Sequence, residues 1–289
     1  MITSMKTAYQ HAEQTLKQKH VEGASLAARA LLEKVCHKQW HELVTQQELS
    51  WTTQYQNAFE QLVARRLKGE PLQYLLEQVT FHDVTLAVGQ ACLIPRPETE
   101  ELVEAVLQRV RAQGTLASLD MLDLATGSGC IAIALAKALP QSRWVASDIS
   151  AEAITLAEHN AKQNQVAHQI QFVTGKDFQA LPAGCRFDWL ISNPPYLSEK
   201  EWRNAQKELQ FEPKQALVAG ELGETFYERI IPRTKAHLAP GGWLAFEIGA
   251  TQGPYVRQQL LQQGFLDVEV VCDLSGHERF VFAQNNMEQ

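Results

Sequence analysis

The first 68 residues place their apolar side chains at helical spacing. From Tyr55 to Leu67, apolar residues recur every three or four positions, which is typical of a helix packed against a core. Gly69 and Pro71 follow directly and would end such a helix. The same 68 residues contain a single glycine and no proline. The pattern therefore predicts a bundle of about four helices, and we expect a separate helical domain over residues 1–72.

The pattern changes after this domain. Short runs of β-branched and aromatic residues, Val79 to Phe81 and Thr85 to Val88, replace the helical stripe. Two such runs separated by a few residues predict a β-hairpin. We therefore expect a hairpin linker over residues 73–95, with a domain boundary near residue 80.

From residue 96 onward, strand-like and helix-like stretches alternate. The expected strands are Leu119–Leu124, Arg143–Asp148, Ile170–Thr174, Phe187–Ser192, Trp243–Ile248, Asp267–Cys272 and Phe280–Ala283. The expected helices between and before them are Pro97–Arg111, Cys130–Leu139, Ala151–Gln163, Thr225–His237 and Gln252–Gln263. This alternation predicts an α/β domain over residues 96–289, with a doubly wound, mainly parallel, seven-stranded sheet. Ligands of such sheets bind at the carboxyl ends of the strands.

Composition and charge narrow the function and the compartment. With 26 basic and 33 acidic residues the net charge is −7, so electrostatics gives no reason to expect direct binding to nucleic acid. The apolar runs are far shorter than a membrane-spanning helix, and we expect no membrane association. The five cysteines are scattered without a C-x-x-C pair, which predicts reduced thiols in the cytoplasm, with neither a disulfide framework nor a metal site.

A glycine-rich turn follows the first expected strand of the α/β domain. Its backbone can approach a ligand closely, and the next helix offers free N–H donors. Asp148, 19 residues after the turn at the end of the next strand, is placed to accept two ribose hydroxyls. Asp177 and Phe178, just past the third strand, are expected to border an adenine ring. The candidate cofactor-binding residues in the turn itself are Asp123, Ala125, Thr126, Gly127, Ser128 and Gly129.

Two classes of ligand use a turn of this kind. Residues 127–132 match the dinucleotide fingerprint G-x-G-x-x-A, which leaves a nicotinamide-dependent oxidoreductase open. Asp123 favours S-adenosylmethionine, because a carboxylate at the end of the strand would repel a pyrophosphate and attract the ammonium group of this cofactor. The structural alternative is that the glycines only end the strand and the aspartates are solvated caps.

A second loop, S-N-P-P-Y at residues 192–196, follows the fourth expected strand. Consecutive prolines lack N–H groups and have a fixed φ, so the chain is stiff and the Pro194 carbonyl is free to accept. The Asn193 side-chain oxygen and this carbonyl can accept both hydrogens of a planar –NH2 group, while Tyr196 stacks on its plane. Two acceptors favour the positive charge that develops as such a nitrogen attacks a sulfonium methyl group. The candidate catalytic residues are Asn193, Pro194 and Tyr196, and the candidate substrate-binding residues are these and Pro195. A plain Asn-Pro turn is the alternative.

These motifs resemble a known family. D-L-x-T-G-S-G with Asp148 and S-N-P-P-Y resembles class I S-adenosylmethionine-dependent methyltransferases that act on planar amino groups. G-E-P-L-Q-Y at residues 69–74, L-I-P-R-P-E-T-E at 93–100, and F-E-I-G at 246–249 followed by Gln252 and Gly253 are similar to the peptide chain release factor glutamine methyltransferases, the HemK/PrmC family. The resemblance covers nearly the whole chain.

The resemblance implies both a fold and a reaction. It implies a Rossmann-like catalytic domain, and a helical N-terminal domain that recognises class 1 release factors as protein substrates. The implied reaction methylates the glutamine side-chain amide of the Gly-Gly-Gln motif in those factors, with S-adenosylmethionine as cofactor, in support of translation termination. The family's cofactor loop corresponds to Ala125–Gly129, its ribose-binding acid to Asp148, its adenine-side contact to Asp177, and its substrate motif to Asn193–Tyr196. We expect Asn193 to contact the cofactor as well.

The chain departs from the family pattern in two places. Ala125 stands where the family usually has glycine, which bears on how closely the cofactor's carboxylate approaches. The family usually reads E-P-R-x-A-L and then G-x-x-G-L, whereas this chain has E-P-K-Q-A-L at residues 212–217 and G-E-L-G at 220–223. The resemblance therefore leaves the role of the loop over residues 211–223 open.

Other functions fit parts of the sequence. The same chemistry on a ribosomal-protein glutamine, or on an exocyclic amino group of DNA or RNA, would use the same Asn-Pro-Pro-Tyr loop. The net charge of −7 and the helical N-terminal domain argue against nucleic acid. Further alternatives are the nicotinamide-dependent oxidoreductase and a catalytically silent adaptor that binds a partner without transferring a methyl group.

Overall fold

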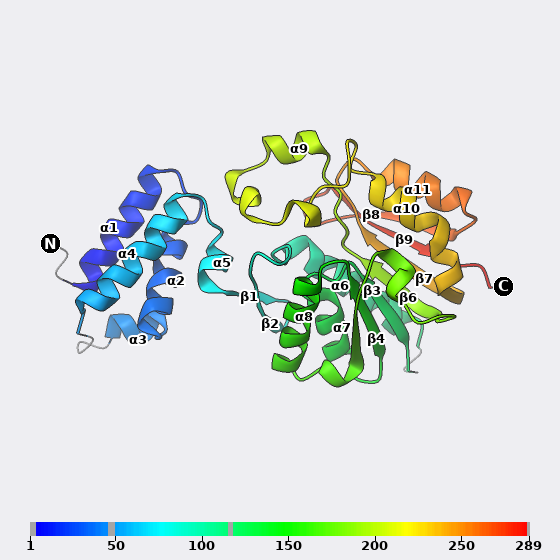
Figure 1. Cartoon of the computed structure of the whole chain (residues 1–289), viewed down its shortest axis with the longest axis horizontal. Helices are drawn as coiled ribbons and strands as arrows, with labels where there is room; N and C mark the ends of the chain where they lie inside the picture. The colour runs from blue at the N-terminus through cyan, green and yellow to red at the C-terminus, as the bar shows by residue number, and fades with distance from the viewer. Residues whose placement is uncertain (1–3, 46–49, 115–117, 288–289) are drawn as a thin grey trace. The chain divides into compact units, whose positions relative to one another are not determined.

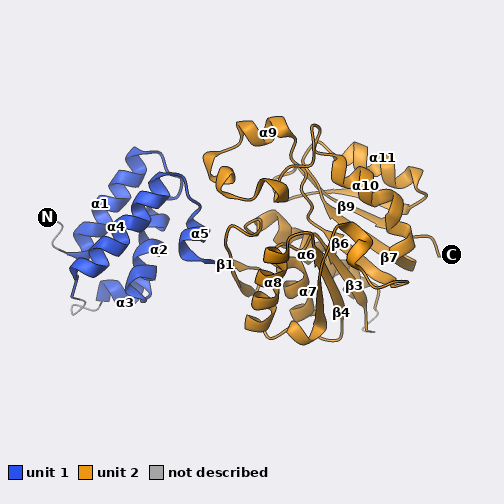
Figure 2. Cartoon of the chain, in the orientation of Figure 1, with its two compact units in different colours: residues 1–78 blue, residues 79–289 orange. Residues whose placement is uncertain are grey.

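Two compact units make up the chain. The computed structural model describes residues 4–45, 50–114 and 118–287. The units comprise residues 1–78 and residues 79–289, blue and orange in Figure 2. The division falls inside the segment 73–95, for which the sequence predicts a hairpin linker, so each unit holds part of that segment.

The N-terminal unit is helical, as the apolar spacing predicts. Its helices are α1 (Met5–Gln18), α2 (Ala24–Cys36), α3 (Trp40–Thr45), α4 (Thr53–Leu67) and α5 (Leu72–Leu76) (Figure 1). The apolar stripes of these helices form one core, in which Leu16, Leu31 and Phe59 are fully buried. Pro71 follows the end of α4 and is also the N-cap of α5. The sequence predicts only the hairpin linker in the segment where this short helix lies.

A β-hairpin follows the N-terminal helices. Strands β1 (Gln78–Phe81) and β2 (Val84–Ala87) form a two-stranded sheet, and His82 turns between them with φ of 51°. Asn160 of α8 (Ala151–Gln163) fixes the far end of β2: its Oδ1 accepts from the Ala87 N–H at 2.7 Å and its Nδ2 donates to the Ala87 carbonyl at 3.1 Å. The second strand is therefore anchored to the rest of the second unit.

The second unit is built on a seven-stranded, mainly parallel sheet, which confirms the predicted fold class. The strands are β3 (Asp120–Leu124), β4 (Arg143–Asp148), β5 (Ile170–Thr174), β6 (Phe187–Ser192), β7 (Leu238–Glu247), β8 (Leu266–Cys272) and β9 (Glu278–Gln284). Their order is β5-β4-β3-β6-β7-β9-β8, in which only β9 runs antiparallel to both neighbours. The order reverses between β3 and β6, and such a switch point opens a crevice at the carboxyl ends of those strands.

Helices cover both faces of this sheet (Figure 1). Besides α8, the described helices of this unit are α6 (Pro97–Ala112), α7 (Cys130–Ala138), α9 (Glu199–Asn204), α10 (Thr225–Thr234) and α11 (Gly253–Gln262). Its 3-10 turns are Ala167–Gln169, Asp177–Ala180, Lys207–Phe211, Lys214–Ala216 and Lys235–His237. Alternate strand residues face opposite layers: Met121 joins the core under α6 and α7, and Leu122 joins the core under α10 and α11. In the described part of the chain, no helix is both long and apolar enough to cross a membrane.

Candidate active site

A cavity of about 460 Å³ lies at the carboxyl ends of the central strands. Segments 90–93 and 213–220 supply much of its wall. The candidate site residues that line it are Ala125, Gly127, Asp148, Asp177, Asn193 and Pro195. The candidates that do not are Asp123, Thr126, Ser128, Gly129, Phe178, Pro194 and Tyr196. The structure therefore brings one residue or more from each predicted motif to a single cavity.

The glycine-rich turn bends through left-handed backbone at alternate residues. Ala125 has φ of 62°, Gly127 of 55° and Gly129 of 82°. Gly129 is also the N-cap of α7, where an added Cβ would lie 2.9 Å from the Ile133 side chain and 3.1 Å from that of Ala157. Glycine is therefore required there by conformation and by space. Ala125 adopts the same left-handed conformation with a Cβ, which gives a physical reason for the family's usual glycine.

Asp123 lies beneath the turn rather than in the cavity wall. It is fully buried; its Oδ2 accepts from the Thr126 hydroxyl at 2.6 Å and from the Ala132 N–H at 3.2 Å. Its Oδ1 has no hydrogen-bond partner among the described residues. Burial raises the pKa of Asp123 to about 7 against these two hydrogen bonds. Direct contact with a cofactor ammonium group stays a prediction, while the observed contacts hold the turn and the start of α7 together.

Asp148 does line the cavity, at the end of β4. Its Oδ2 accepts from the Gly127 N–H and its Oδ1 from the Ser150 N–H, both at 2.9 Å. Burial raises the pKa of Asp148, although these backbone hydrogen bonds oppose the shift. Each carboxylate oxygen has two lone-pair positions, so each can accept one further hydrogen from a ligand.

Asp177 reaches the cavity with its carboxylate already paired. Arg229 donates to both of its oxygens, at 2.7 and 2.9 Å, and Arg233 donates to Oδ2 at 2.9 Å. Burial works to raise the pKa of Asp177, but the hydrogen bonds and charges of the two arginines outweigh it and hold that pKa below its ordinary value. Phe178 points away from the cavity into the core and stacks on His237 at 4.3 Å between ring centroids.

The loop after β6 presents two unused acceptors. Asn193 donates from Nδ2 to the Thr99 hydroxyl at 2.9 Å, while its Oδ1 is buried without a partner among the described residues. No described residue donates to the Pro194 carbonyl. Tyr196 is held from two sides: its hydroxyl donates to Glu247 at 3.4 Å, and its carbonyl accepts from Gln252 at 3.0 Å. An unsatisfied buried acceptor is uncommon in a folded protein and indicates a place for a donor.

Thr99, Glu247 and Gln252 belong to the site, although the sequence analysis gives them no role. Thr99 and Glu247 are each 1% exposed, and the Thr99 hydroxyl donates to Glu247 Oε2 at 2.7 Å. Burial raises the pKa of Glu247 to about 7, against the hydrogen bond from Thr99. Their positions in the sequence could have indicated this role. Glu247 ends the strand next to β6, and Thr99 and Glu247 lie in the motifs P-E-T-E and F-E-I-G.

The loop over residues 211–223, where the chain departs from the family pattern, forms part of the cavity wall. Its Glu212 is 5% exposed, and the Glu212 carboxylate accepts from the Ile94 N–H at 2.9 Å and forms a short ion pair with Arg96. These contacts join the loop to residues 94 and 96, which directly follow the cavity-lining segment 90–93. Gln252 fixes the end of this loop, because it also donates to the Gly223 carbonyl at 3.0 Å.

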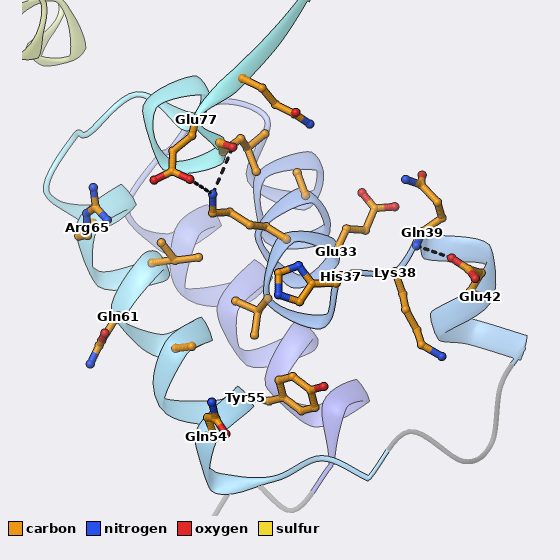
Figure 3. Close-up of a pocket in the computed structure, with 17 residues that line it drawn as sticks. Glu33, His37, Lys38, Gln39, Glu42, Gln54, Tyr55, Gln61, Arg65 and Glu77 are labelled. Carbon is orange, nitrogen blue, oxygen red and sulfur yellow. Dashed lines mark hydrogen bonds and ion pairs between the residues drawn. The ribbon is translucent and has the colours of Figure 1, made fainter. Parts of the chain in front are cut away.

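A larger hollow, of about 910 Å³, lies in the N-terminal unit (Figure 3). Lys34 lines it and donates to the Leu76 carbonyl at 3.2 Å and to the Glu77 carboxylate at 2.6 Å. Gln54 and Gln61 of α4 are exposed on its wall. Among the described residues there is no group of three or more His, Cys, Asp or Glu side chains that could hold a metal ion. The wall of this hollow offers polar contacts of both charges.

Comparison with known sequences places both units. The chain matches the family described as PrmC N-terminal domain over residues 7–76, and the family described as Methyltransferase small domain over residues 101–226. The release factor glutamine methyltransferase of Vibrio cholerae is 36% identical over 289 residues, which cover 100% of this chain and 99% of that protein. The enzyme of that name from Koribacter versatilis is 37% identical over 279 residues, covering 92% and 97%.

Comparison with solved structures agrees on the fold. The hMettl16 catalytic domain superposes with a TM-score of 0.57 at 20% identity, covering 79% of this chain and 82% of that one. The T. thermophilus 16S rRNA N2 G1207 methyltransferase gives a TM-score of 0.52 at 18% identity, covering 72% and 50%. The sheet order and these likenesses identify the Rossmann-like fold of class I methyltransferases.

Proposed function

We infer the reaction from one premise: the chain belongs to the family of release factor glutamine methyltransferases. It is therefore an S-adenosylmethionine-dependent protein-glutamine methyltransferase. We propose that its substrate is the Gly-Gly-Gln glutamine of class 1 peptide chain release factors, methylated on the side-chain nitrogen in the cytoplasm. The observation that carries this proposal is a pair of acceptors to which no described residue donates, Asn193 Oδ1 and the Pro194 carbonyl, beside the cavity at the switch point of the sheet.

The residues of the cavity fit S-adenosylmethionine. Asp148 has two oxygens that each retain an acceptor position, which suits a pair of ribose hydroxyls. Gly127 brings backbone to the cavity wall without a side chain, and Asp177 with its two arginines would form the adenine side. When bound, this cofactor supplies an electrophilic methyl group on a sulfonium sulfur. We propose that Asp148, the turn 125–129 and Asp177 hold it.

The acceptor pair suits an amide nitrogen as nucleophile. The lone pair of a glutamine amide is delocalised, so the nitrogen attacks poorly unless positive charge on it is stabilised. Asn193 Oδ1 and the Pro194 carbonyl would each accept one of its hydrogens and strengthen as that charge develops. One nitrogen–carbon bond forms, the carbon–sulfur bond breaks, and the nitrogen then loses one proton. No strong base is needed, because the alkylated amide is acidic.

We propose that the N-terminal unit binds the release factor. Its hollow mixes acidic, basic and amide side chains, which suits a polar protein surface. A Gln61→Trp variant would fill part of this hollow from the exposed side of α4. We expect a severalfold higher KM for the full-length release factor and an unchanged rate on a short Gly-Gly-Gln peptide. Asn57→Trp, on the same helix outside the hollow, is the control.

One experiment tests the reaction directly. Purified protein is incubated with a release factor and methyl-labelled S-adenosylmethionine, and the labelled residue is located by mass spectrometry. We expect label on the Gly-Gly-Gln glutamine, and a loss of roughly a hundredfold or more in single-turnover rate for Asn193→Ala with little change in cofactor affinity. Asn204→Ala, at an exposed position of α9, is the matched control. Label on nucleic acid or on another protein alone, or a normal rate for Asn193→Ala, would overturn the proposal.

A further inference from the structure

Two buried side chains, Thr99 and Glu247, and the partly buried Asn193 come from separate segments and form a hydrogen-bonded chain behind the acceptor pair. Thr99 lies in the first turn of α6, Asn193 follows β6, and Glu247 is the last residue of the neighbouring strand β7. The Thr99 hydroxyl donates to Glu247 Oε2 at 2.7 Å and accepts from Asn193 Nδ2 at 2.9 Å. Thr99 is therefore donor to one neighbour and acceptor to the other.

This chain determines which way the Asn193 amide faces. A hydroxyl has one hydrogen, and the Thr99 hydroxyl donates its hydrogen in the hydrogen bond to Glu247 Oε2. The Thr99 oxygen then presents only a lone pair to Asn193, so the amide nitrogen and not the amide oxygen must face it. In the opposite orientation two oxygens would meet without a hydrogen between them, which is repulsive.

The acceptor role proposed for Asn193 depends on this orientation. With the nitrogen held by Thr99, the only other polar atom of the side chain, Oδ1, is left without a partner in the described residues. If the amide turned over, an –NH2 group would replace the acceptor and would meet the hydrogens of the substrate nitrogen. The orientation of the Asn193 amide thus decides whether the substrate nitrogen meets a hydrogen-bond acceptor or a repulsive donor.

We propose that Thr99 and Glu247 are positioning residues that keep the Asn193 oxygen available to the substrate amide. This inference rests on the proposed function, because it assigns the purpose of the chain to the methyl-transfer step. Neither residue touches the substrate in this proposal: Glu247 orients the Thr99 hydroxyl, and Thr99 orients the amide. Tyr196, whose hydroxyl donates to Glu247 Oε1 at 3.4 Å, steadies the far side of the carboxylate.

Thr99→Val is the informative variant, because it keeps the shape of the side chain and removes both hydrogen bonds. We expect the single-turnover rate at saturating cofactor and release factor to fall roughly ten- to a hundredfold, with the cofactor dissociation constant within about twofold of wild type. Thr99→Ser should recover most of the lost rate. Glu247→Gln should also stay active, because its amide oxygen can still accept from Thr99, whereas Glu247→Leu should resemble Thr99→Val.

A double variant separates positioning from a merely structural contribution. If Thr99 acts through Asn193, adding Thr99→Val to Asn193→Ala should leave the rate of Asn193→Ala unchanged. Multiplying losses in the double variant would overturn the proposal. A normal rate for Thr99→Val, or no recovery with Thr99→Ser in a folded protein, would do the same.

A readout without turnover distinguishes this inference from the proposed function. With asparagine side chains labelled with nitrogen-15, the Asn193 –NH2 signal is assigned by its loss in Asn193→Ala. We expect slow hydrogen exchange at this group in the wild type and in Thr99→Ser, and faster exchange in Thr99→Val. Equal exchange in all three would refute the positioning role, whatever the enzyme methylates. A protected amide in a protein that does not methylate release factors would refute the proposed function alone.

Discussion

The buried Asp123 should make the stability of the catalytic unit fall as the pH rises. Asp123→Asn removes the titrating group and keeps its shape. The Asn carbonyl can take the place of Oδ2, which accepts from Thr126 and Ala132, and its –NH2 takes the place of the unpartnered Oδ1. That –NH2 gains no acceptor, so the substitution has a cost of about 1–3 kcal/mol that does not depend on pH. The pH dependence therefore isolates the carboxylate.

The sign and size of this pH dependence follow from the raised pKa of Asp123. Burial raises the pKa of Asp123 from 3.8 to about 7, so between these values the folded protein binds more protons than the unfolded chain. The contribution of Asp123 to the free energy of unfolding therefore falls as the pH rises through this window. At roughly 1.4 kcal/mol per pKa unit, the contribution of Asp123 falls by about 2–3 kcal/mol between pH 5 and pH 8. The difference between Asp123→Asn and wild type should rise in favour of the variant by that amount.

Urea unfolding at a series of pH values measures this difference. A background with Trp40→Phe and Trp51→Phe confines tryptophan fluorescence to the second unit. Asp177→Asn is the control, because the Asp177 carboxylate is held by Arg229 and Arg233, which outweigh burial and keep its pKa below its ordinary value. Its stabilisation is complete above the unfolded pKa, so its loss should be the same at pH 5 and pH 8. A difference between Asp123→Asn and wild type that is constant over this range would refute the reasoning.

Two further changes at the cofactor side have defined outcomes. Asp148→Ala should remove most of the rise in melting temperature that S-adenosylmethionine gives the wild type, because a ligand that binds only the folded state stabilises that state. An undiminished rise would exclude Asp148 from the cofactor site. A rise with a nicotinamide dinucleotide instead of S-adenosylmethionine would exclude the methyltransferase assignment. Ala125→Gly should stabilise the catalytic unit by about 1 kcal/mol in urea unfolding, because the residue has φ of 62° and only glycine adopts it without strain. A loss of stability in this variant would show that the Ala125 methyl group contributes more by packing than its backbone strain removes.

The sheet could be predicted because its signals are local. Each buried strand is a short apolar run, and helical patterns separate most of the strands from the next, so periodicity alone locates the strands. The beginning of β7 was less clear: the structure starts this strand at Leu238, where it pairs with Phe187, whereas the apolar run begins only at Trp243. The residues between them include Pro240 and two glycines, which weaken a strand signal that tertiary pairing restores.

Whether a site residue is buried or lines the cavity could not be predicted from its position at the end of a strand. Asp123 and Asp148 both occupy strand ends, yet only Asp148 lines the cavity. The difference arises in the turn, where the left-handed backbone at Ala125 and Gly127 folds the chain over Asp123. Backbone torsions of this kind leave only a weak trace in sequence, and here the alanine obscures even the usual glycine.

The polar chain behind Asn193 shows why pairing is harder to predict than motif content. Thr99 is 94 residues from Asn193 and 148 residues from Glu247 along the chain. In sequence, Thr99 reads as part of an acidic first helical turn, and Glu247 as the polar end of a buried strand. Each has an adequate local explanation, so nothing in either segment points to the other. Only the pairing of β6 with β7, and the position of α6 beside them, gives the carboxylate a hydroxyl to orient and the hydroxyl an amide to hold. The catalytic meaning of the Asn-Pro-Pro-Tyr loop thus depends on two residues outside it, and substitutions at Thr99 test that dependence without altering the loop.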